Sequence, residues 1–357
     1  MKRNHDTCIA SRAGKKPAAP APSTALRLAR SSAFGLRLRT LVLFASTLAG
    51  ASLAEAQDFP TKPIKVIVTT AAGGLGDTVF RTAADSMAKY LGQPIVIENK
   101  PGGSSTLGTS AAVKAPADGH TLVMTSDTSL VVVPLLRTNL PYDAEKDLAV
   151  LAPLARIPVG LVVPAKLPVN SVKEFVAYAR ANPGRLNFAS IGAGTSYHLA
   201  AEMFFSQEKL DLVHVPYLGG GQMLTSLIRN DTSAAFAGLA TFIEQAKVGR
   251  VKILAVSGDL RLVSLPNVPT FKESGFPDYQ VSAHVGLAAP KATPLEIQRR
   301  LIEAVNSALE APNYRRTLAD HGMVVPAKTT PAAYAAELDT ERKRWTALIS
   351  ERHITIN

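Results

Sequence analysis

The sequence predicts an α/β protein of two lobes, in which largely parallel sheets are flanked by helices. The 357-residue chain is 46% hydrophobic and 19% charged, which excludes a disordered or low-complexity chain. Short apolar runs alternate with amphipathic stretches, a pattern typical of parallel α/β sheets. Two extended apolar segments, residues 151–164 and 279–290, contain few turn signals and are predicted to cross between the lobes as hinge strands.

A basic leader precedes the predicted lobes. Residues 1–56 contain nine Lys or Arg and two acidic residues, and they end in an apolar run at 41–53 followed by Ala54-Glu55-Ala56. This order predicts a Sec-type signal peptide that is cleaved after Ala56. The alternative is a buried or membrane-anchoring helix. It is disfavoured because the small-x-small cleavage triplet is well placed, and the run is too short to span a hydrocarbon core of about 30 Å as a helix.

The charge and cysteine content of the mature chain, residues 57–357, exclude several classes of protein. Removing the nine basic and two acidic residues of the leader lowers the net charge from +11 to +4, so nucleic acid is not an expected partner. The single cysteine, Cys8, lies in the leader. This excludes a disulfide framework, a cysteine-rich zinc site and an iron–sulfur centre. The expected location of the mature protein is the periplasm.

The predicted elements follow from hydrophobic periodicity. Apolar runs predict strands at residues 63–69, 95–98, 121–126, 186–190, 234–237 and 252–256. Amphipathic stretches predict helices at residues 77–91, 104–114, 170–181 and 195–205. In the first helix, Phe80, Ala84, Met87 and Leu91 recur at helical spacing.

Capping signals place three helix starts. Ser171 and Glu174 form a capping-box pattern at the start of the helix at 170–181. Thr293-Pro294-x-Glu296 predicts a helix that Thr293 caps and in which Pro294 is the first residue. Thr330-Pro331 opens a long C-terminal helix.

The two crossings divide the mature chain between the lobes. One lobe is predicted to contain residues 57–156 together with 283–357, and the other residues 157–282. A chain that crosses twice leaves a cleft between its lobes, and clefts at domain interfaces are preferred ligand sites.

The first candidate binding element is a Gly-rich turn between the strand at 63–69 and the helix at 77–91. Glycine lets the backbone approach a ligand closely, and a helix N-terminus presents free N–H groups to a carboxylate or phosphate. An ordinary strand–helix turn with Asp77 as a capping carboxylate fits the same residues. A nucleotide loop of the GxxxxGK[ST] kind is excluded because no Lys-Ser or Lys-Thr follows. The candidate ligand-binding residues here are Thr70, Ala72, Gly73, Gly74 and Asp77.

The second candidate repeats this arrangement in the other lobe, between the strand at 186–190 and the helix at 195–205. Together the two loops would hold a small anion from both sides. Thr195 is either only a helix cap or a cap that also faces the cleft, and His198 is either a ligand contact or a structural histidine. The candidates are Ser190, Gly192, Gly194, Thr195 and His198, to which Ser126 and His284 are added.

Two further Gly-rich segments, residues 100–105 and 217–222, open predicted helices. Each is either another wall of the cleft or a flexible turn. The chain contains no G-x-S-x-G elbow, no H-E-x-x-H and no C-x-x-C, and its seven histidines lack metal-ligand spacing. We therefore expect no enzyme activity, no metal and no cofactor. The alternative is a secreted hydrolase that uses Ser190 or Thr195 with His198.

Short motifs in collinear order carry a resemblance to a known family. They are Phe59-Pro60-x-Lys62-Pro63-Ile64, Gly73-Gly74-x-x-Asp77-x-x-x-Arg81, Glu98-Asn99-Lys100-Pro101-Gly102-Gly103, Ala117-Asp118-Gly119-His120-Thr121-Leu122, Leu140-Pro141-Tyr142-Asp143, Ala189-Ser190-x-Gly192-x-Gly194-Thr195-x-x-His198-Leu199, His214-Val215-Pro216-Tyr217, Val268-Pro269-Thr270-Phe271-x-Glu273-x-Gly275 and Gly286-Leu287-x-Ala289-Pro290. With these motifs residues 57–357 resemble the Bug receptors, the periplasmic substrate-binding proteins of tripartite tricarboxylate transporters.

The resemblance implies a type II periplasmic-binding fold, a two-lobed Venus flytrap that captures a small carboxylate. It implies that the loops at 70–77 and 190–198 grip the carboxylate, partly through ordered water. It also implies delivery of the ligand to a two-component membrane permease, and we expect a monomer. The alternative is a ligand-sensing receptor of the same fold that feeds a signalling system. The chain departs from the family pattern at residues 69–72, 235–238 and at His284, so the family does not specify the ligand.

Overall fold

The computed structural model describes residues 59–355. The predicted signal peptide, residues 1–56, and its cleavage site lie outside this range. Among the helices of residues 59–355, none has both the length and the apolar character that a membrane span requires.

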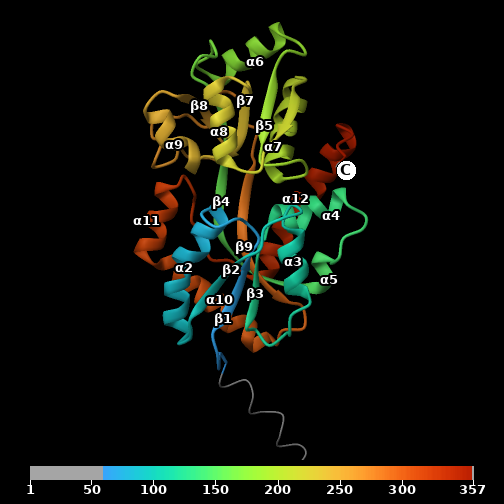
Figure 1. Cartoon of the computed structure of the whole chain (residues 1–357), viewed down its shortest axis with the longest axis vertical. Coiled ribbons are helices and arrows are strands. Elements are labelled where there is room, and N and C mark those ends of the chain that lie inside the picture. Colours follow the sequence, from blue (N-terminus) through green and yellow to red (C-terminus); the bar gives the residue numbers. More distant parts are fainter. Residues whose placement is uncertain (1–58, 356–357) are drawn as a thin grey trace, which may run out of the picture. The chain divides into compact units, whose positions relative to one another are not determined.

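Strands and helices alternate along the described residues. The strands are β1 (Ile64–Val68), β2 (Ile95–Asn99), β3 (Thr121–Ser126), β4 (Leu148–Pro164), β5 (Asn187–Ser190), β6 (Val213–Pro216), β7 (Ala234–Gly238), β8 (Val251–Val256) and β9 (Ser282–Pro290). The helices are α2 (Leu75–Leu91), α3 (Thr106–Val113), the π-helix η1 (Thr128–Val132), α4 (Val133–Leu136), α5 (Ala144–Asp147), α6 (Val172–Ala181), α7 (Ser196–Glu208), α8 (Gly220–Arg229), α9 (Ala240–Lys247), α10 (Leu295–Glu310), α11 (Pro312–Asp320) and α12 (Pro331–Glu351) (Figure 1).

The strands form two sheets that share β4. Sheet A has the order β2-β1-β3-β9-β4, and sheet B has the order β4-β7-β5-β6, with β8 also paired to β4. β1 is parallel to β2 and β3, and β5 is parallel to β6 and β7. The long strands add antiparallel pairs, because β9 runs against β3 and β4, and β4 runs against β7 and β8. Each sheet is therefore a parallel core extended by antiparallel strands.

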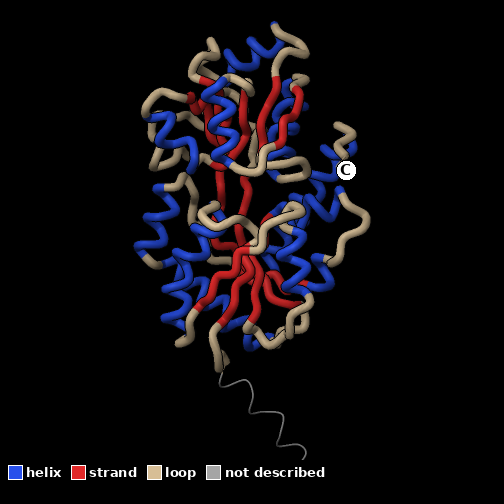
Figure 2. The backbone as a smooth tube through the Cα atoms, viewed as in Figure 1, coloured by secondary structure: helices blue, strands red, loops and turns tan. Residues whose placement is uncertain are grey.

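The segments predicted as crossings form two long strands. β4 has 17 residues, which pair with β9 from Leu148 to Pro158 and with β7 or β8 from Val159 to Pro164. Figure 2 shows two strands that run between an upper and a lower group of strands. Their action as a hinge stays a prediction.

Helices cover both sheets, and each sheet with its helices forms a lobe. Lobe A is sheet A with α2, α3 and α10, and lobe B is sheet B with α6, α7, α8 and α9 (Figure 1). Fully buried aromatic rings pack against one another in the core of lobe B, among them Phe188, Phe204, Phe205 and Phe236. The predicted two-lobed α/β fold is confirmed, whereas the predicted domain boundaries stay a prediction.

The C-terminal helix α12 contacts both lobes. It packs against β4 and η1 of lobe A and against α7 of lobe B. Near its end, Arg352 pairs with Glu202 of α7 at 3.0 Å. Earlier in the helix, Arg344 donates a hydrogen bond to the Gln280 carbonyl at 2.6 Å. These contacts make α12 a bridge between the lobes.

Hydrogen bonds confirm two of the predicted caps and correct the third. The Ser171 hydroxyl accepts from the N–H of Glu174, and Thr330 caps α12 in the same way. The prediction that Thr293 caps α10 is wrong, because Pro294 is the N-cap and the helix begins at Leu295. Pro294 has an extended ψ of 142°, which keeps it outside the helix.

Candidate functional site

The first Gly-rich loop is held in shape by Asp77. The Asp77 side chain is 3% exposed and accepts hydrogen bonds from the Gly73 N–H at 2.9 Å, from Arg81 Nε at 2.8 Å and from Asn99 Nδ2 at 2.8 Å. Burial opposes ionisation of this carboxyl, but the hydrogen bonds from Arg81, Gly73 and Asn99 outweigh burial and lower the pKa of Asp77. Asp77 is therefore an ionised brace inside the loop.

The backbone N–H groups of Gly73 and Gly74 both have acceptors within the loop. The Gly73 N–H donates to Asp77, and the Gly74 N–H donates to the Ala71 carbonyl at 3.0 Å. Gly73 has a φ of +78°, a left-handed conformation that favours glycine. The Gly pair thus shapes the turn, and its N–H groups are already used within the protein. Ala72 is exposed on the same loop.

The residues that follow Gly74, at the start of α2, have backbone N–H groups without a partner in the helix. Gly74 is the N-cap, so the N–H groups of Leu75 and Gly76 have no carbonyl partner within the helix. The Thr70 hydroxyl is buried without a hydrogen-bond partner, 2.9 Å from the position that a Cβ at Gly76 would take. Thr70 and the first helical turn together present hydrogen-bonding groups without protein partners.

The second loop repeats the construction with histidine in place of aspartate. The Gly194 N–H donates to His198 Nδ1 at 3.3 Å, again to a side chain four residues ahead. Thr195 Oγ1 donates to the Gly192 carbonyl at 2.8 Å and accepts from the His198 N–H at 3.4 Å. Thr195 is therefore the N-cap of α7, as predicted. Gly192 and Gly194 have φ values of +124° and +70°.

His198 is a buried, uncharged histidine in this structure. Its ring stacks on that of His214 with centroids 4.0 Å apart, and its Nε2 lies 3.8 Å from Glu202. Burial lowers the pKa of His198 to about 3 and that of His214 to about 4. These contacts lie within the protein, and a ligand contact by His198 stays a prediction.

Ser190 pairs with His214 and not with His198. Its hydroxyl lies 2.7 Å from His214 Nε2 and 3.1 Å from the Gly192 carbonyl. A serine beside a histidine is the usual start of a nucleophilic site. Ser190 is 0% exposed, and its hydroxyl already has two partners within the loop region of lobe B.

The two loops meet where the lobes touch. Ser196 of α7 donates its backbone N–H to Thr128 Oγ1 at 3.3 Å, and the two hydroxyls are also 3.3 Å apart. A Cβ built at Gly238 would lie 2.8 Å from Leu75 Cδ1 and 3.1 Å from the Tyr197 hydroxyl. The starts of α2 and α7 therefore converge. We use the name loop junction for Leu75, Thr128, Ser196, Tyr197 and Gly238.

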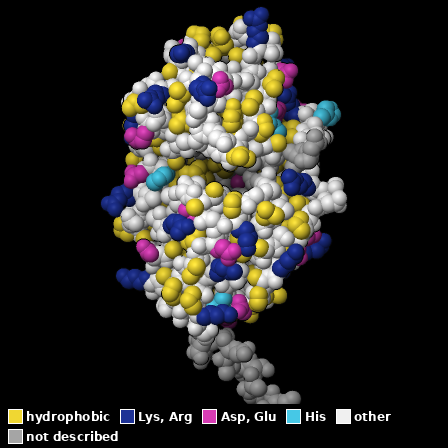
Figure 3. Space-filling view, viewed as in Figure 1, with side chains coloured by type: hydrophobic (Ala, Val, Ile, Leu, Met, Phe, Trp, Pro, Cys, Tyr) yellow, Lys and Arg dark blue, Asp and Glu magenta, His cyan; other side chains and the backbone are white. Residues whose placement is uncertain are grey.

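Two ionisable groups lie at the loop junction: Tyr197, which belongs to it, and Asp127, which precedes Thr128 in the chain. Burial raises the pKa of Tyr197, so its hydroxyl stays protonated and can donate. Asp127 is 2% exposed and accepts a hydrogen bond from the His284 N–H at 3.3 Å. Burial raises the pKa of Asp127 to about 6. The face drawn in Figure 3 is hollowed between the two lobes.

The structure does not place His284 with the two loops. His284 pairs with Arg156 across the β4–β9 ladder, whereas the next residue of β4, Ile157, points toward Gly238. Because neighbours along a strand face opposite sides, His284 faces away from the loop junction. Its ring lies against Tyr334 with centroids 5.5 Å apart.

Ser126 stands close to the loop junction, but its groups are already engaged. It ends β3, one residue before Asp127. Its N–H donates to Ser129 Oγ at 3.0 Å, and its hydroxyl accepts from the Ser129 N–H at 3.3 Å.

None of the five residues of the loop junction was named individually as a candidate, although Leu75, Ser196 and Tyr197 lie within the predicted loops at 70–77 and 190–198. Leu75 follows the Gly pair, and Ser196 and Tyr197 follow the α7 cap, so a search of the first helical turn would have found them. Thr128 and Gly238 have no such signal, because only the fold brings them to the loops. Among the residues that the structure describes, no group of three His, Cys, Asp or Glu side chains could hold a metal ion.

Comparisons with known proteins identify the family. The model of the tripartite tricarboxylate transporter family receptor matches residues 79–354. The protein BugT of Bordetella pertussis is 30% identical over 315 residues, which cover 88% of this chain and 96% of BugT.

Solved structures agree in fold and in sequence. MatC from Rhodopseudomonas palustris with bound malate is 32% identical with a TM-score of 0.73, and covers 82% of this chain and 100% of its own. The R. palustris protein Rpa4515 with adipate is 28% identical with a TM-score of 0.77, and covers 84% of this chain and 99% of its own. The resemblance read from the sequence motifs is therefore confirmed, and the chain belongs to the Bug family of tripartite tricarboxylate transporter receptors.

Proposed function

We propose that this protein captures a small organic carboxylate between the starts of α2 and α7, and delivers it to the membrane permease of a tripartite tricarboxylate-type transporter. One observation carries the proposal: two helix N-termini from opposite lobes converge at the loop junction. A carboxylate placed between them would interact favourably with both helix dipoles and accept charge-assisted hydrogen bonds.

The contacts within the loops refine which groups bind. Gly73, Gly74 and Gly194 shape the loops, because their N–H groups already have acceptors within the protein. The donors left for a ligand on α2 are the N–H groups of Leu75 and Gly76 and the Thr70 hydroxyl. On α7 the corresponding donor is the hydroxyl of Tyr197.

The ligand class is proposed from related receptors. MatC binds malate and Rpa4515 binds adipate, and both resemble this chain over nearly their whole length. Both ligands are small dicarboxylates, so dicarboxylates of this size are the first compounds to test. The Asp77–Arg81 pair leaves the first loop without a net charge, which favours an anion over the cation that a free Asp77 would attract.

Isothermal titration calorimetry with malate and adipate tests the proposal. We expect one equivalent to bind the mature chain. Thr70→Val and Tyr197→Phe each remove one hydroxyl and keep the shape, so each should weaken binding about 10- to 150-fold, the effect of losing a hydrogen bond to a charged group. Thr82→Val and Tyr178→Phe are matched controls outside the loop junction and should bind like the parent.

Two results would contradict this assignment. Unchanged affinity in both Thr70→Val and Tyr197→Phe, with binding to the parent established, would exclude the loop junction as the site. Nuclear magnetic resonance of the ligand after release distinguishes receptor from enzyme, because a receptor returns its ligand unchanged and a hydrolase does not.

The location and the transport role need separate tests. Protein recovered from the periplasm should begin at Gln57, since the leader is predicted to be cleaved after Ala56. An intact leader on that protein would contradict export by this route. Uptake of the bound compound should be lost when the gene for this chain is deleted, and unchanged uptake would favour the sensory alternative.

A further inference from the structure

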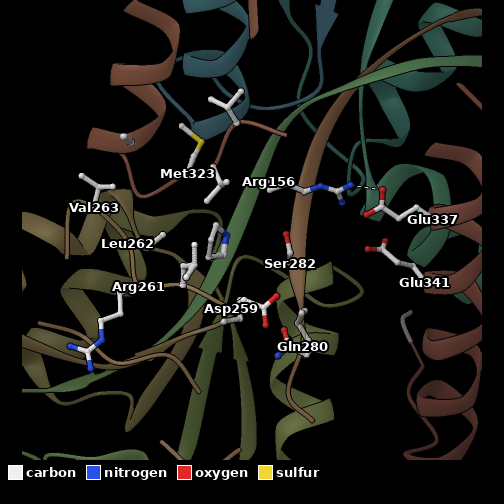
Figure 4. A pocket seen from close by; sticks show the side chains of 18 of the residues that line it. Arg156, Asp259, Arg261, Leu262, Val263, Gln280, Ser282, Met323, Glu337 and Glu341 are labelled. Atoms are coloured by element: carbon white, nitrogen blue, oxygen red, sulfur yellow. Dashed lines mark hydrogen bonds and ion pairs between the residues drawn. The ribbon is translucent and has the colours of Figure 1, made fainter. Parts of the chain in front are cut away.

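A cavity of about 800 Å³ lies behind the crossing of β4 and β9 (Figure 4). Its walls come from both lobes: Arg156 of β4, Ser282 of β9, residues 257–263 of lobe B, Met323 after α11, and one side of α12. The residues of the loop junction do not line it. The volume is in the range of small-molecule sites, about 300 to 1,000 Å³. We call it the rear cavity.

One side of the rear cavity holds buried polar atoms without hydrogen-bond partners. Glu341 is 8% exposed, and its Oε2 has no partner. Figure 4 shows its carboxyl pointing into the cavity from α12. Arg344 Nε is also buried without a partner, and Arg344 Nη2 lies 4.0 Å from Glu341 Oε1. Buried polar atoms in this state are unfavourable, so a polar group that bonds to both would be stabilised there.

Burial also determines the charge of this end. Burial, together with the nearby charge of Asp127, raises the pKa of Glu341, which favours the protonated carboxyl, the form that can donate to an acceptor. His284 stands behind Glu341, with Nδ1 at 3.7 Å from Oε2, and burial lowers its pKa to about 3. Neither group then adds a charge at neutral pH.

The remaining charges of the rear cavity favour an anion. Arg156, Arg261 and Asp259 each lie beside an oppositely charged side chain. Arg344 stands next to the protonated Glu341, and among the described residues Arg315 has no ion-pair partner. The unbalanced charges that line the cavity are therefore positive.

The opposite side of the cavity is apolar and partly uncovered. Leu262 and Met323 are buried, whereas Leu260 and Val263 are 82% and 85% exposed. In Figure 4 the side chains of Leu262, Val263 and Met323 lie across the cavity from Glu337 and Glu341. A hydrocarbon body that lay between the two sides would remove this apolar surface from water.

We propose that the rear cavity is a second ligand site, specific for an amphipathic monocarboxylate. The carboxylate accepts hydrogen bonds from Arg344 Nε and from the Glu341 carboxyl, and the hydrocarbon body covers Leu260 and Val263. This site is separate from the loop junction and does not depend on the function proposed for it.

Calorimetry of the mature chain with octanoate tests the second site. One equivalent of octanoate should bind, and octylammonium and octan-1-ol should bind at least about tenfold more weakly because they lack the anion. Arg344→Met should weaken octanoate binding by about tenfold or more. Val263→Asp changes an exposed residue, so the fold is retained while a charge is placed against the hydrocarbon body, and binding should fall by a similar factor. Val248→Asp, at a residue 67% exposed and outside the cavity, is the matched control and should bind like the parent.

Three outcomes would overturn the proposal. The first is no octanoate binding to the parent chain. The second is equal binding to the parent, Arg344→Met and Val263→Asp. The third is loss of binding in Tyr197→Phe with Arg344→Met unaffected, which would place octanoate in the loop junction.

Discussion

Replacing Asp77 by alanine should destabilise the protein and deform the first loop. Asp77 accepts three hydrogen bonds, from Gly73, Arg81 and Asn99, at 2.8 to 2.9 Å. Alanine removes all three acceptor contacts. Asn99 Nδ2 keeps its second acceptor, the Thr70 carbonyl at 3.1 Å, whereas the Gly73 N–H and Arg81 Nε lose the partner described here. Gly73 is exposed and the Arg81 side chain is 53% exposed, so water can replace part of both lost contacts.

The expected cost follows from these contacts. A hydrogen bond to a charged group contributes about 1.5 to 3 kcal/mol. Because water can replace part of the Gly73 and Arg81 contacts and Asn99 keeps a second acceptor, the net loss is little more than one such bond. We therefore expect the free energy of unfolding to fall by about 2 to 4 kcal/mol at pH 7. The deficit should shrink in acid. A carboxyl with a lowered folded-state pKa contributes its stability above the unfolded pKa and loses it as the pH falls through the folded-state pKa.

Urea denaturation at pH 7 and pH 3 measures both effects. Asp85→Ala is the matched control, because Asp85 is exposed on the same helix. Binding of malate or adipate to Asp77→Ala should weaken as well, since the turn that leads into Leu75 is no longer fixed. A change at pH 7 no larger than that of Asp85→Ala would refute the view that Asp77 braces the loop.

Three further predictions concern stability. Burial raises the pKa of Glu341 above its usual value, so the parent should lose stability as the pH rises above about 5. Glu341→Gln should lack this loss, and the difference between the two unfolding free energies should grow with pH by up to about 1.4 kcal/mol per unit in denaturant titrations. Thr195→Val removes the α7 cap and should lower the unfolding free energy by about 1 kcal/mol, whereas Thr195→Ser should restore it; equal melting of both variants would contradict the cap. Gly119 has a φ of +79°, and a Cβ there would lie 2.7 Å from the Phe59 ring. Gly119→Ala should therefore destabilise the protein by about 2 kcal/mol more than Gly249→Ala, because Gly249 has a similar φ but open space around its Cα. Equal melting temperatures of the two variants would exclude the steric contribution.

The elements of the fold that the sequence predicted are those with local signals. α2 and β1 have clear apolar periodicity, and the cap at Ser171 depends on residues three apart. The pairing of β9 with β3 and β4 joins segments far apart in the sequence, and no local pattern specifies it. The wrong cap at Thr293 has a local cause: the extended ψ of Pro294 makes Pro294 the N-cap, so α10 begins at Leu295.

The sequence predicted the two strand–turn–helix segments but not the contacts within them. The two Gly-rich turns do lead into helix starts that converge, as expected from strand–turn–helix order. The side chains of Asp77 and His198 accept hydrogen bonds from the N–H groups of Gly73 and Gly194, four residues earlier, so these N–H groups are not free for a ligand. The four-residue spacing permits these hydrogen bonds but does not require them, so the sequence could not predict them. The direction of His284 could not be predicted either, because it depends on the register between β4 and β9.

The placement of β9 also has a consequence for how the chain must fold as it is made or exported. β1, β2 and β3 emerge early, but one edge of β3 is covered only by β9, which begins at Ser282. All the strands of sheet B lie between Leu148 and Val256, so that sheet can be completed first. Until residue 282 and its neighbours arrive, the N-terminal segment presents an open strand edge that can pair with another chain. Nascent chains that stop before this point should therefore aggregate, and the order of assembly should run from the middle of the sequence outward.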